Sequence, residues 1–280
     1  HLFEGVFKHA GKLRSYDISK KEWVLRGDSV VYGRAADIMM ALRYDIQQEK
    51  DFNYKGLNTD EIIDHIVDFV TLLWQNHPFR EGNTRTTAVF VIKYLRSIGF
   101  KVDNDLFADN SWYFRNALVR ANYRNPSKGI EPNKSFLIKF FRNLLMGEDH
   151  ELKNRYMLVG YNDVDATSAS THTSTHASTH TSTYENTHTS SDSSVSILSE
   201  NIKRLLVTIG TGEKSVKEMM EAVGLKNRPN FLEYSLSPAI TEGLVKMKYP
   251  NSPRHPRQKY LLTVKGLMVY DDCLKSKRKI

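Results

Sequence analysis

The sequence predicts a mainly α-helical protein: an all-helical core with one small β-hairpin, followed by a separate C-terminal winged helix-turn-helix of α+β type. Apolar residues recur with a helical period through most of residues 35–158. One stretch, residues 18–32, has β-forming residues on both sides of an Arg-Gly-Asp turn. A Ser/Thr/His-rich stretch then separates residues 1–160 from residues 196–280, so we expect residues 161–195 to be a flexible linker.

Seven helices are expected in the first part of the chain. Asn58, with Glu61 three residues later, predicts the start of a helix that continues over Asp60–Trp74. Thr86–Ile98 is almost wholly apolar, so it should be a buried central helix that stops at Gly99. The other expected helices are Leu2–Ala10, Ala35–Gln48, Asn104–Tyr123, Pro132–Met146 and Glu148–Leu158.

The loop between the two central helices carries residues suited to phosphate chemistry. The first turn of a helix has unpaired N–H groups and a partial positive charge, and Gly82 and Asn83 let the backbone curl around an anion. Arg85 adds a cation for phosphate oxygens. Glu81 is a hard oxygen ligand suited to Mg²⁺, and His77 is suited to act as a general base near neutral pH.

This loop reads His77-Pro78-Phe79-Arg80-Glu81-Gly82-Asn83-Thr84-Arg85 and resembles the Fic family motif, His-Pro-Phe-x-(Asp/Glu)-Gly-Asn-x-Arg-x-x-Arg. Fic enzymes are mainly AMP-transferases that move AMP from ATP to a hydroxyl group of a target protein. The resemblance implies ATP as donor, Mg²⁺ as cofactor and a Ser, Thr or Tyr acceptor. It implies that His77 deprotonates the acceptor and that Glu81 holds Mg²⁺. The implied nucleotide-binding residues are Arg80, Gly82, Asn83, Thr84 and Arg85.

Two positions depart from the family motif. Thr84 stands where the family usually has Gly, and Ala88 stands where the second Arg is expected. In the family, that Arg reaches the γ-phosphate and pairs with an inhibitory Glu. The departure leaves the nucleotide donor open, with Arg80 and Arg155 as alternative sources of the missing cation.

The segment Ala10-Gly11-Lys12-Leu13-Arg14 also resembles the Fic core, which commonly has Ala-Gly-x-x-Arg. The hairpin that follows corresponds to the flap of the family, which pairs with the target segment as an added strand. Trp23, Val24 and Leu25 are the residues expected to bind the target. The alternative is an ordinary edge hairpin that packs on the helices.

Residues 166–194 contain no Leu, Ile, Val, Phe or Trp, so no apolar face is available for burial. Three histidines recur at the four-residue spacing of metal ligands on a helix: His172, His176 and His180. Ser and Thr runs form helices poorly, which favours a linker over a metal site. The inhibitory helix pattern of the family, (Ser/Thr)-x-x-x-Glu-(Gly/Asn), is matched by Thr181 with Glu185-Asn186 and by Ser196 with Glu200-Asn201.

The basic excess lies in the last third of the chain. Residues 195–280 contain 16 of the 40 Lys and Arg but 8 of the 32 Asp and Glu, which leaves 24 of each sign elsewhere. This asymmetry indicates a polyanionic partner for the C-terminal part alone. Helices are expected at Ile197–Ile209, at Val216–Val223 after the Ser215 cap, and from Asn227 onward, with strands at Leu244–Met247 and Tyr260–Thr263.

This order of elements resembles a winged helix, and similar domains follow many bacterial Fic domains. The third helix and the wing would contact DNA. The residues expected at DNA are Lys226, Asn227, Arg228, Asn230, Arg254, Arg257 and Lys259. The alternative is a protein-docking module. The end of the chain, 275–279, is expected to be a basic tail.

Cys273 is the only cysteine, which is consistent with a reducing, cytoplasmic location. No apolar run reaches transmembrane length and no signal-peptide pattern opens the sequence, so no membrane contact is expected. His1 in place of Met indicates that the natural N-terminus lies upstream. The oligomeric state is left open, with a homo-oligomer as one option.

The sequence therefore predicts a bacterial Fic-type nucleotidyltransferase that transfers AMP to a protein (AMPylation) and is coupled to a DNA-binding winged helix. Two alternatives stay open. One is a Fic enzyme that uses a different nucleotide donor. The other is a DNA-binding regulator in which the Fic domain is a nucleotide sensor or a scaffold.

Overall fold

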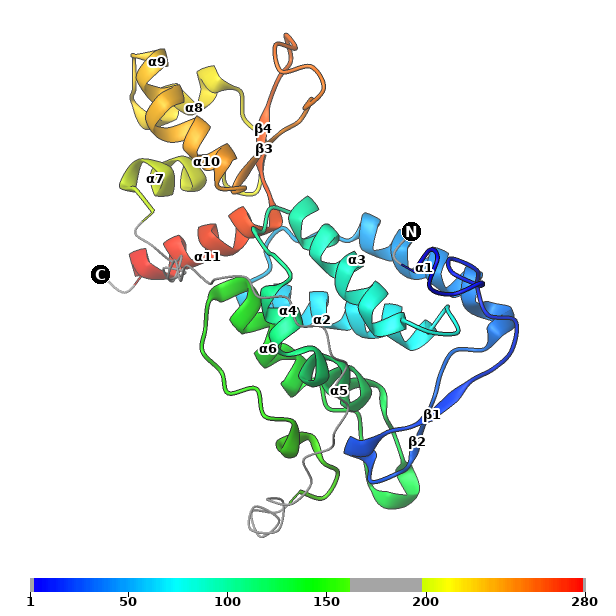
Figure 1. The fold of residues 1–280 in the computed structure, drawn as a ribbon. Coiled ribbons are helices and arrows are strands. Elements are labelled where there is room, and N and C mark those ends of the chain that lie inside the picture. Colours follow the sequence, from blue (N-terminus) through cyan, green and yellow to red (C-terminus); the bar gives the residue numbers. More distant parts are fainter. Residues whose placement is uncertain (1–2, 162–197, 279–280) are drawn as a thin grey trace, which may run out of the picture.

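The computed structural model describes residues 3–161 and 198–278, and it confirms a mostly helical protein with two small two-stranded sheets (Figure 1). In the first part, strands β1 (Ser19–Lys21) and β2 (Ser29–Val31) form an antiparallel hairpin around the short helix η1 (Trp23–Leu25). The remaining elements are η2 (Ala35–Asp37), α1 (Ile38–Asp51), α2 (Thr59–Asn76), α3 (Asn83–Ser97), α4 (Asp105–Asp109), α5 (Ser111–Asn122), η3 (Pro126–Lys128), α6 (Ser135–Met146) and η4 (Asn154–Met157).

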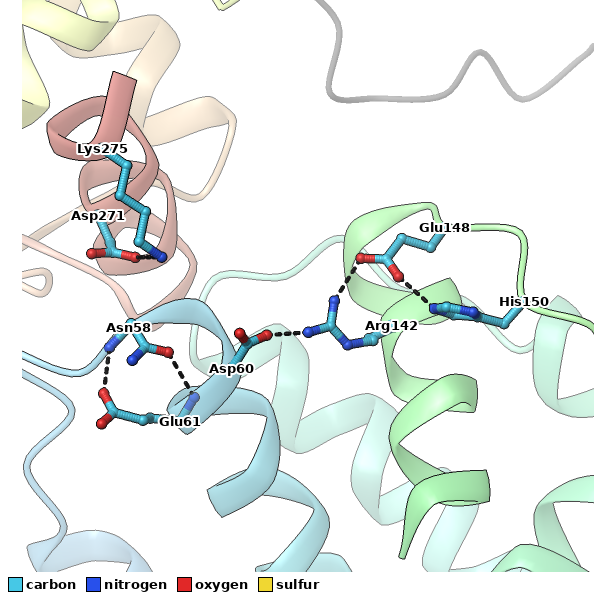
Figure 2. Close-up of polar contacts among 8 residues, drawn as sticks. All are labelled: Asn58, Asp60, Glu61, Arg142, Glu148, His150, Asp271 and Lys275. Carbon is cyan, nitrogen blue, oxygen red and sulfur yellow. Dashed lines mark hydrogen bonds and ion pairs between the residues drawn. The ribbon is translucent and has the colours of Figure 1, made fainter. Parts of the chain in front are cut away.

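Helix α2 is the buried centre of this part, where it contacts α1, α3, α5 and α6. Its start has the predicted capping box: the Asn58 side chain accepts the Glu61 N–H at 3.1 Å, and the Glu61 carboxylate accepts the Asn58 N–H at 2.8 Å (Figure 2). Arg142 on α6 pairs with Asp60 in the first turn of α2 and with Glu148 at 2.8 Å. These contacts fix the helix whose far end carries His77.

Helix α3 differs from the prediction of a wholly buried helix. Thr87, Val91 and Leu95 on one face are buried, whereas Phe90 is 37% exposed and Lys93 is exposed. Among the described elements, α3 packs mainly against α2, so only one face needs to be apolar. The prediction of a central buried helix therefore applies to α2.

Three other helix predictions need correction. Residues 3–11 form turns, in which Gly5 at φ 80° prevents a continuous helix. Asn104–Tyr123 is two helices, because the chain leaves helical geometry at Asn110, where φ is −118° and ψ is 30°. Glu148–Leu158 is irregular apart from η4.

The second part contains α7 (Glu200–Ile209), α8 (Val216–Val223) and a continuous run made of α9 (Arg228–Phe231), the π-turn η7 (Leu232–Leu236) and α10 (Ser237–Thr241). Strands β3 (Val245–Met247) and β4 (Tyr260–Leu262) pair in antiparallel register. Ser215 forms the predicted cap of α8 in a capping box with Glu218, and Gly224 ends that helix in the left-handed conformation. Helix α11 (Val264–Arg278) was not predicted: residues 275–278 end a helix and are not a loose basic tail.

The two parts pack directly on each other. A Cβ atom added at Gly99 would overlap the carbonyl oxygen of Gly243, and Lys265 donates its backbone N–H to the Ile98 carbonyl at 3.3 Å. Lys101 pairs with Glu242 at 3.0 Å. Helix α11 also contacts α2, and the buried apolar residues of both parts form one cluster. The C-terminal part is therefore docked on the helical core.

Most of the predicted linker (161–195) lies outside the described residues, as do the three spaced histidines and the Thr181 match to the inhibitory pattern. Of the second match, Ser196 is also outside, whereas Glu200 and Asn201 form the first turn of α7. None of the helices in the described ranges is long and apolar enough to cross a membrane.

Candidate active site

The backbone at His77 turns sharply out of α2. His77 ends this helix in the left-handed conformation, with φ 43° and ψ 58°, which is uncommon for a residue with a side chain. Its Nδ1 lies 2.9 Å from the Trp74 carbonyl oxygen. Because a carbonyl only accepts, Nδ1 carries the proton and Nε2 keeps a lone pair. The fold thus selects the tautomer that a general base needs.

Two aromatic rings enclose the imidazole of His77, which is 3% exposed. The Tyr32 ring stacks on it at 3.6 Å, and the Trp74 ring meets it edge-on at 4.7 Å. Burial lowers the pKa of His77 to about 3, and the nearby charges of Lys20 and Arg115 add to this lowering. His77 is therefore neutral at physiological pH.

Arg14 forms hydrogen bonds with the backbone of the loop. Its Nε donates to the His77 carbonyl at 2.8 Å, and its Nη2 donates to the Asn76 carbonyl at 3.2 Å and to the Gly33 carbonyl. Its backbone N–H donates to the Pro78 carbonyl at 2.9 Å. The buried guanidinium donates mainly to backbone oxygens, and the Asp17 carboxylate lies 3.9 Å from its Nη1, so Arg14 positions the loop. The Ala10-Gly11-Lys12-Leu13-Arg14 segment does not by itself indicate this role.

The side chain of Asn83 shapes the loop from inside. Its Oδ1 accepts the Phe79 N–H at 2.8 Å, and its Nδ2 donates to the Phe79 carbonyl at 2.8 Å. Gly82 adopts φ 78° just before α3, and its carbonyl accepts the Thr86 N–H at 2.9 Å. Thr84 accepts the Trp74 indole N–H at 3.0 Å. The side chains of Asn83 and Thr84 are thus engaged within the protein, and their contribution to an anion site is the backbone.

Charged side chains lie near the N-terminus of α3. Glu81 is exposed, and its carboxylate lies 3.8 Å from the Lys20 ammonium on β1. The guanidinium of Arg85 lies 4.8 Å from the centre of the Phe3 ring, and that of Arg80 lies 5.4 Å from the centre of the Tyr16 ring.

The two alternative cations for the missing motif Arg are placed differently. Arg80 belongs to the loop itself, whereas Arg155 lies on η4, which packs on α5 and η1. Arg155 has its guanidinium 5.4 Å from the centre of the Tyr156 ring. Ala88 lies on α3 and is partly buried.

A small pocket opens beside the loop. Its volume is about 170 Å³, and its lining combines aromatic rings with a few polar side chains. The lining residues are Phe3, Phe7, His9, Ala10, Gly11, Phe79, Glu81 and Thr86. The Phe3 ring lies where a side chain at position 82 would be, so only glycine fits there. The pocket brings Glu81 and the start of α3 to one accessible space.

Comparison with known proteins identifies a domain in each part of the chain. A family model described as "Fic/DOC family" matches residues 1–95, and one described as "Filamentation induced by cAMP protein Fic-like, C-terminal domain" matches residues 200–263. The chain carries a Fic/DOC domain. The similarity predicted from the His77 loop is thereby confirmed.

Among relatives, protein adenylyltransferase VbhT of Bartonella schoenbuchensis is 30% identical over 104 residues, which are 37% of this chain and 20% of VbhT. The chain thus spans about one fifth of the length of that relative. A Fic family protein from Desulfovibrio desulfuricans G20 aligns with a TM-score of 0.35 and 19% identity, over 94% of this chain and 65% of that one. BepC of Bartonella tribocorum, with bound AMPPNP, aligns with a TM-score of 0.36 and 20% identity, over 49% of this chain and 66% of that one.

In the hairpin of this Fic domain, two of the three residues expected to bind a target are buried. Trp23, Val24 and Leu25 form η1 between the strands, where Val24 and Leu25 are 0% and 2% exposed. Val24 accepts the Val159 N–H at 2.9 Å. Trp23 is 49% exposed, so of the three expected target-binding residues only Trp23 offers its side chain to a partner. The buried pair anchors the hairpin instead.

In the C-terminal part of the Fic chain, five of the residues expected at DNA are exposed: Lys226, Arg228, Asn230, Arg254 and Arg257. Asn227 is also exposed, but its side chain caps α9 by accepting the Asn230 N–H at 3.1 Å. Lys259 is half-buried and lies 3.3 Å from the Glu213 carboxylate. Asn227 and Lys259 therefore have structural partners already.

Proposed function

We propose that this Fic protein is a bacterial, cytoplasmic nucleotidyltransferase that moves AMP from ATP to a Ser, Thr or Tyr hydroxyl of a protein target. The observation that carries the proposal is the neutral, oriented imidazole of His77, which Trp74 links to the first turn of α3: its ring meets the imidazole at 4.7 Å and its indole N–H donates to Thr84. A scaffold or sensor has no need for an imidazole held in the basic tautomer. That the relative VbhT is named a protein adenylyltransferase supports AMP as the transferred group.

The chemistry assigns one role to each part of the loop. The acceptor oxygen attacks the α-phosphorus, the bond from that phosphorus to the bridging oxygen breaks, and pyrophosphate leaves. His77 Nε2 takes the proton of the hydroxyl. The backbone N–H groups at Gly82 and Asn83 face the phosphate at the positive end of α3. Arg85 stabilises the charge on the leaving group.

Glu81 fits the role of Mg²⁺ ligand by its chemistry and exposure. Its carboxylate is a hard oxygen donor on the rim of the pocket, 3.8 Å from its Lys20 partner and therefore not locked in a short ion pair. Bound there, Mg²⁺ would neutralise phosphate charge. In this proposal Glu81 is the single residue of the loop that holds the ion.

A labelling experiment tests the activity. The protein is incubated with Mg²⁺, a bacterial lysate and each of ATP, GTP, UTP and CTP labelled at the α-phosphate. We expect label on protein from ATP and none in the His77→Ala variant, whereas His150→Ala, in the segment after α6, keeps the wild-type level. Absence of label with all four nucleotides, or equal labelling by His77→Ala, would contradict the proposal.

We further propose that α8 to α10 with the β3–β4 hairpin form a winged helix that binds DNA. The exposed basic residues at the start of α9 and at the hairpin tip, together with the charge excess of this part, support it. Binding of a labelled duplex should weaken as salt rises, and replacing Arg254 and Arg257 with Glu should reduce both the affinity and the salt dependence. Salt-independent or unchanged binding would favour the protein-docking alternative.

The open groove beside α9 is the feature that favours protein docking. It is lined by Arg228, Pro229, Leu232, Glu233 and Ser237, and its volume is about 640 Å³.

The alternative of a DNA-binding regulator makes a different prediction for His77. A regulator whose Fic domain is a sensor or scaffold would regulate normally in the His77→Ala variant. An AMP-transferase would lose its activity in this variant.

A further inference from the structure

Lys20 on β1 points toward the core of the molecule. The strand register places Lys20 directly opposite Val30, which is 2% exposed. Residues directly opposite in an antiparallel pair project from the same face, so Lys20 shares the inward face of the hairpin. Its neighbours Ser19 and Lys21 project from the other face and are exposed. The Lys20 side chain itself is 33% exposed.

The ammonium of Lys20 lies beside two key residues of the loop. Its Nζ is 3.8 Å from the Glu81 carboxylate. It is also close enough to His77 to contribute, after burial, to lowering the pKa of that residue. One cation on the hairpin thus faces both the base and the carboxylate of the motif.

The other basic side chains around the loop contact groups other than Glu81. Arg14 donates to backbone carbonyls behind the loop. Arg80 lies over the Tyr16 ring and Arg85 over the Phe3 ring. Position 88, where the family has its second Arg, is Ala. Of these four basic residues, Lys20 is the one that lies against Glu81, near the N-terminus of α3.

We propose that Lys20 supplies the cation that Ala88 lacks and binds the terminal phosphates of the nucleotide donor. This inference rests on the proposed function for the class of its ligand, a nucleoside triphosphate. Without nucleotide, Lys20 pairs with Glu81; with nucleotide, its ammonium exchanges the carboxylate for phosphate oxygens. An ammonium is a compact point charge on a flexible stem, so this exchange needs rotation of the side chain only. Lys20 then contacts a triphosphate but not a monophosphate.

Equilibrium binding distinguishes these two ligands without requiring turnover. The affinity for α,β-methylene-ATP, which cannot release pyrophosphate, and for AMP is measured in Mg²⁺ by titration calorimetry. We expect Lys20→Met to weaken binding of the triphosphate analogue about tenfold, the loss of one charge-assisted contact, with little change for AMP. Lys20→Arg should keep most of the affinity. Lys21→Met, on the outer face of the same strand, is the matched control and should bind as the wild type does.

Wild-type affinity of Lys20→Met for the analogue, or an equal loss for the analogue and AMP, would overturn the inference. The outcome is separable from that of the proposed function. If Lys20→Met loses triphosphate affinity while the wild type transfers no label, the phosphate role of Lys20 stands and AMP transfer fails. If label is transferred and Lys20→Met binds normally, AMP transfer stands and the role of Lys20 fails.

Discussion

The phenol ring of Tyr32 lies 3.6 Å from the imidazole of His77, with the two planes inclined by only 18°. Tyr32 directly follows β2, so the stack joins the hairpin to the residue proposed as the base. The Tyr32 hydroxyl is 3.5 Å from the buried carboxylate of Glu22, which binds Arg115 at 2.6 Å. A chain of contacts thus leads from α5 through the hairpin to His77, and it keeps water away from the imidazole.

Replacing Tyr32 with Leu should raise the pKa of His77. Removal of the stacked ring admits water to the imidazole, which reduces the desolvation that holds the pKa of His77 near 3. NMR of the imidazole signals should show no titration of His77 above about pH 4 in the wild type and a shift toward the ordinary value of about 6.5 in the variant. Tyr32→Phe keeps the stacked ring and is the control. An unchanged titration in Tyr32→Leu would show that the stack does not shield His77.

Because of His77, the free energy of unfolding should decrease as the pH is lowered. Its pKa in the folded state is lowered, so the unfolded chain binds this proton more readily between about pH 6.5 and pH 3. The stabilisation is present above the upper value and is lost as pH falls through this window, by up to ~1.4 kcal/mol per pH unit. Urea unfolding at pH 7, 6 and 5 should show a shallower decline for His77→Gln than for the wild type. Parallel declines would contradict the low pKa.

Asn83→Ala should destabilise the fold and distort the loop. The change leaves the N–H and the carbonyl of Phe79 without their shared partner, which costs about 1–3 kcal/mol when such groups are buried. Thermal unfolding measures the loss. Asn53→Ala is the control, since Asn53 makes a comparable bond to the Lys55 N–H at 3.1 Å in an exposed turn. Equal effects of the two substitutions would show that the Asn83 contacts add nothing specific.

Gly99→Ala should separate the C-terminal part from the helical core. The added methyl group would overlap the backbone of Gly243, and Gly99 has φ 107°, which a side chain rarely adopts. Hydrogen exchange should then become faster in α11 and in the last turn of α3. Gly56→Ala carries a similar positive φ of 86° but faces open space, so it controls for backbone strain. Unchanged exchange in Gly99→Ala would contradict a tight junction at this point.

Local signals in the sequence located most elements. Capping residues such as Asn58 and Ser215 predicted helix starts closely, because their hydrogen bonds span three residues and need no distant partner. The short helix η1 buries Val24 and Leu25, two of the residues expected to bind a target, because its backbone does not alternate as a strand does. Helix α11 was missed because its apolar residues directly follow β4, and its polar end resembles a tail.

The residues of the candidate site were predictable from the sequence, but the contacts that hold them in place were not. The motif identified His77 and Glu81, whereas the bonds of Arg14 to the loop and the approach of Lys20 depend on chain segments about 60 residues away. The family resemblance implied that Asn83 binds nucleotide, and in the fold its side-chain amide holds Phe79. Such contacts require knowledge of which backbone groups meet in space.

The most direct test of a nucleotidyltransferase centred on His77 compares two labels on ATP. The protein and its target are incubated in parallel with ATP labelled at the α-phosphate and with ATP labelled at the γ-phosphate. The proposed reaction predicts that only the α-label becomes attached to protein, and that it disappears in the His77→Ala variant. Attachment of the γ-label instead, or of the α-label regardless of His77, would contradict it.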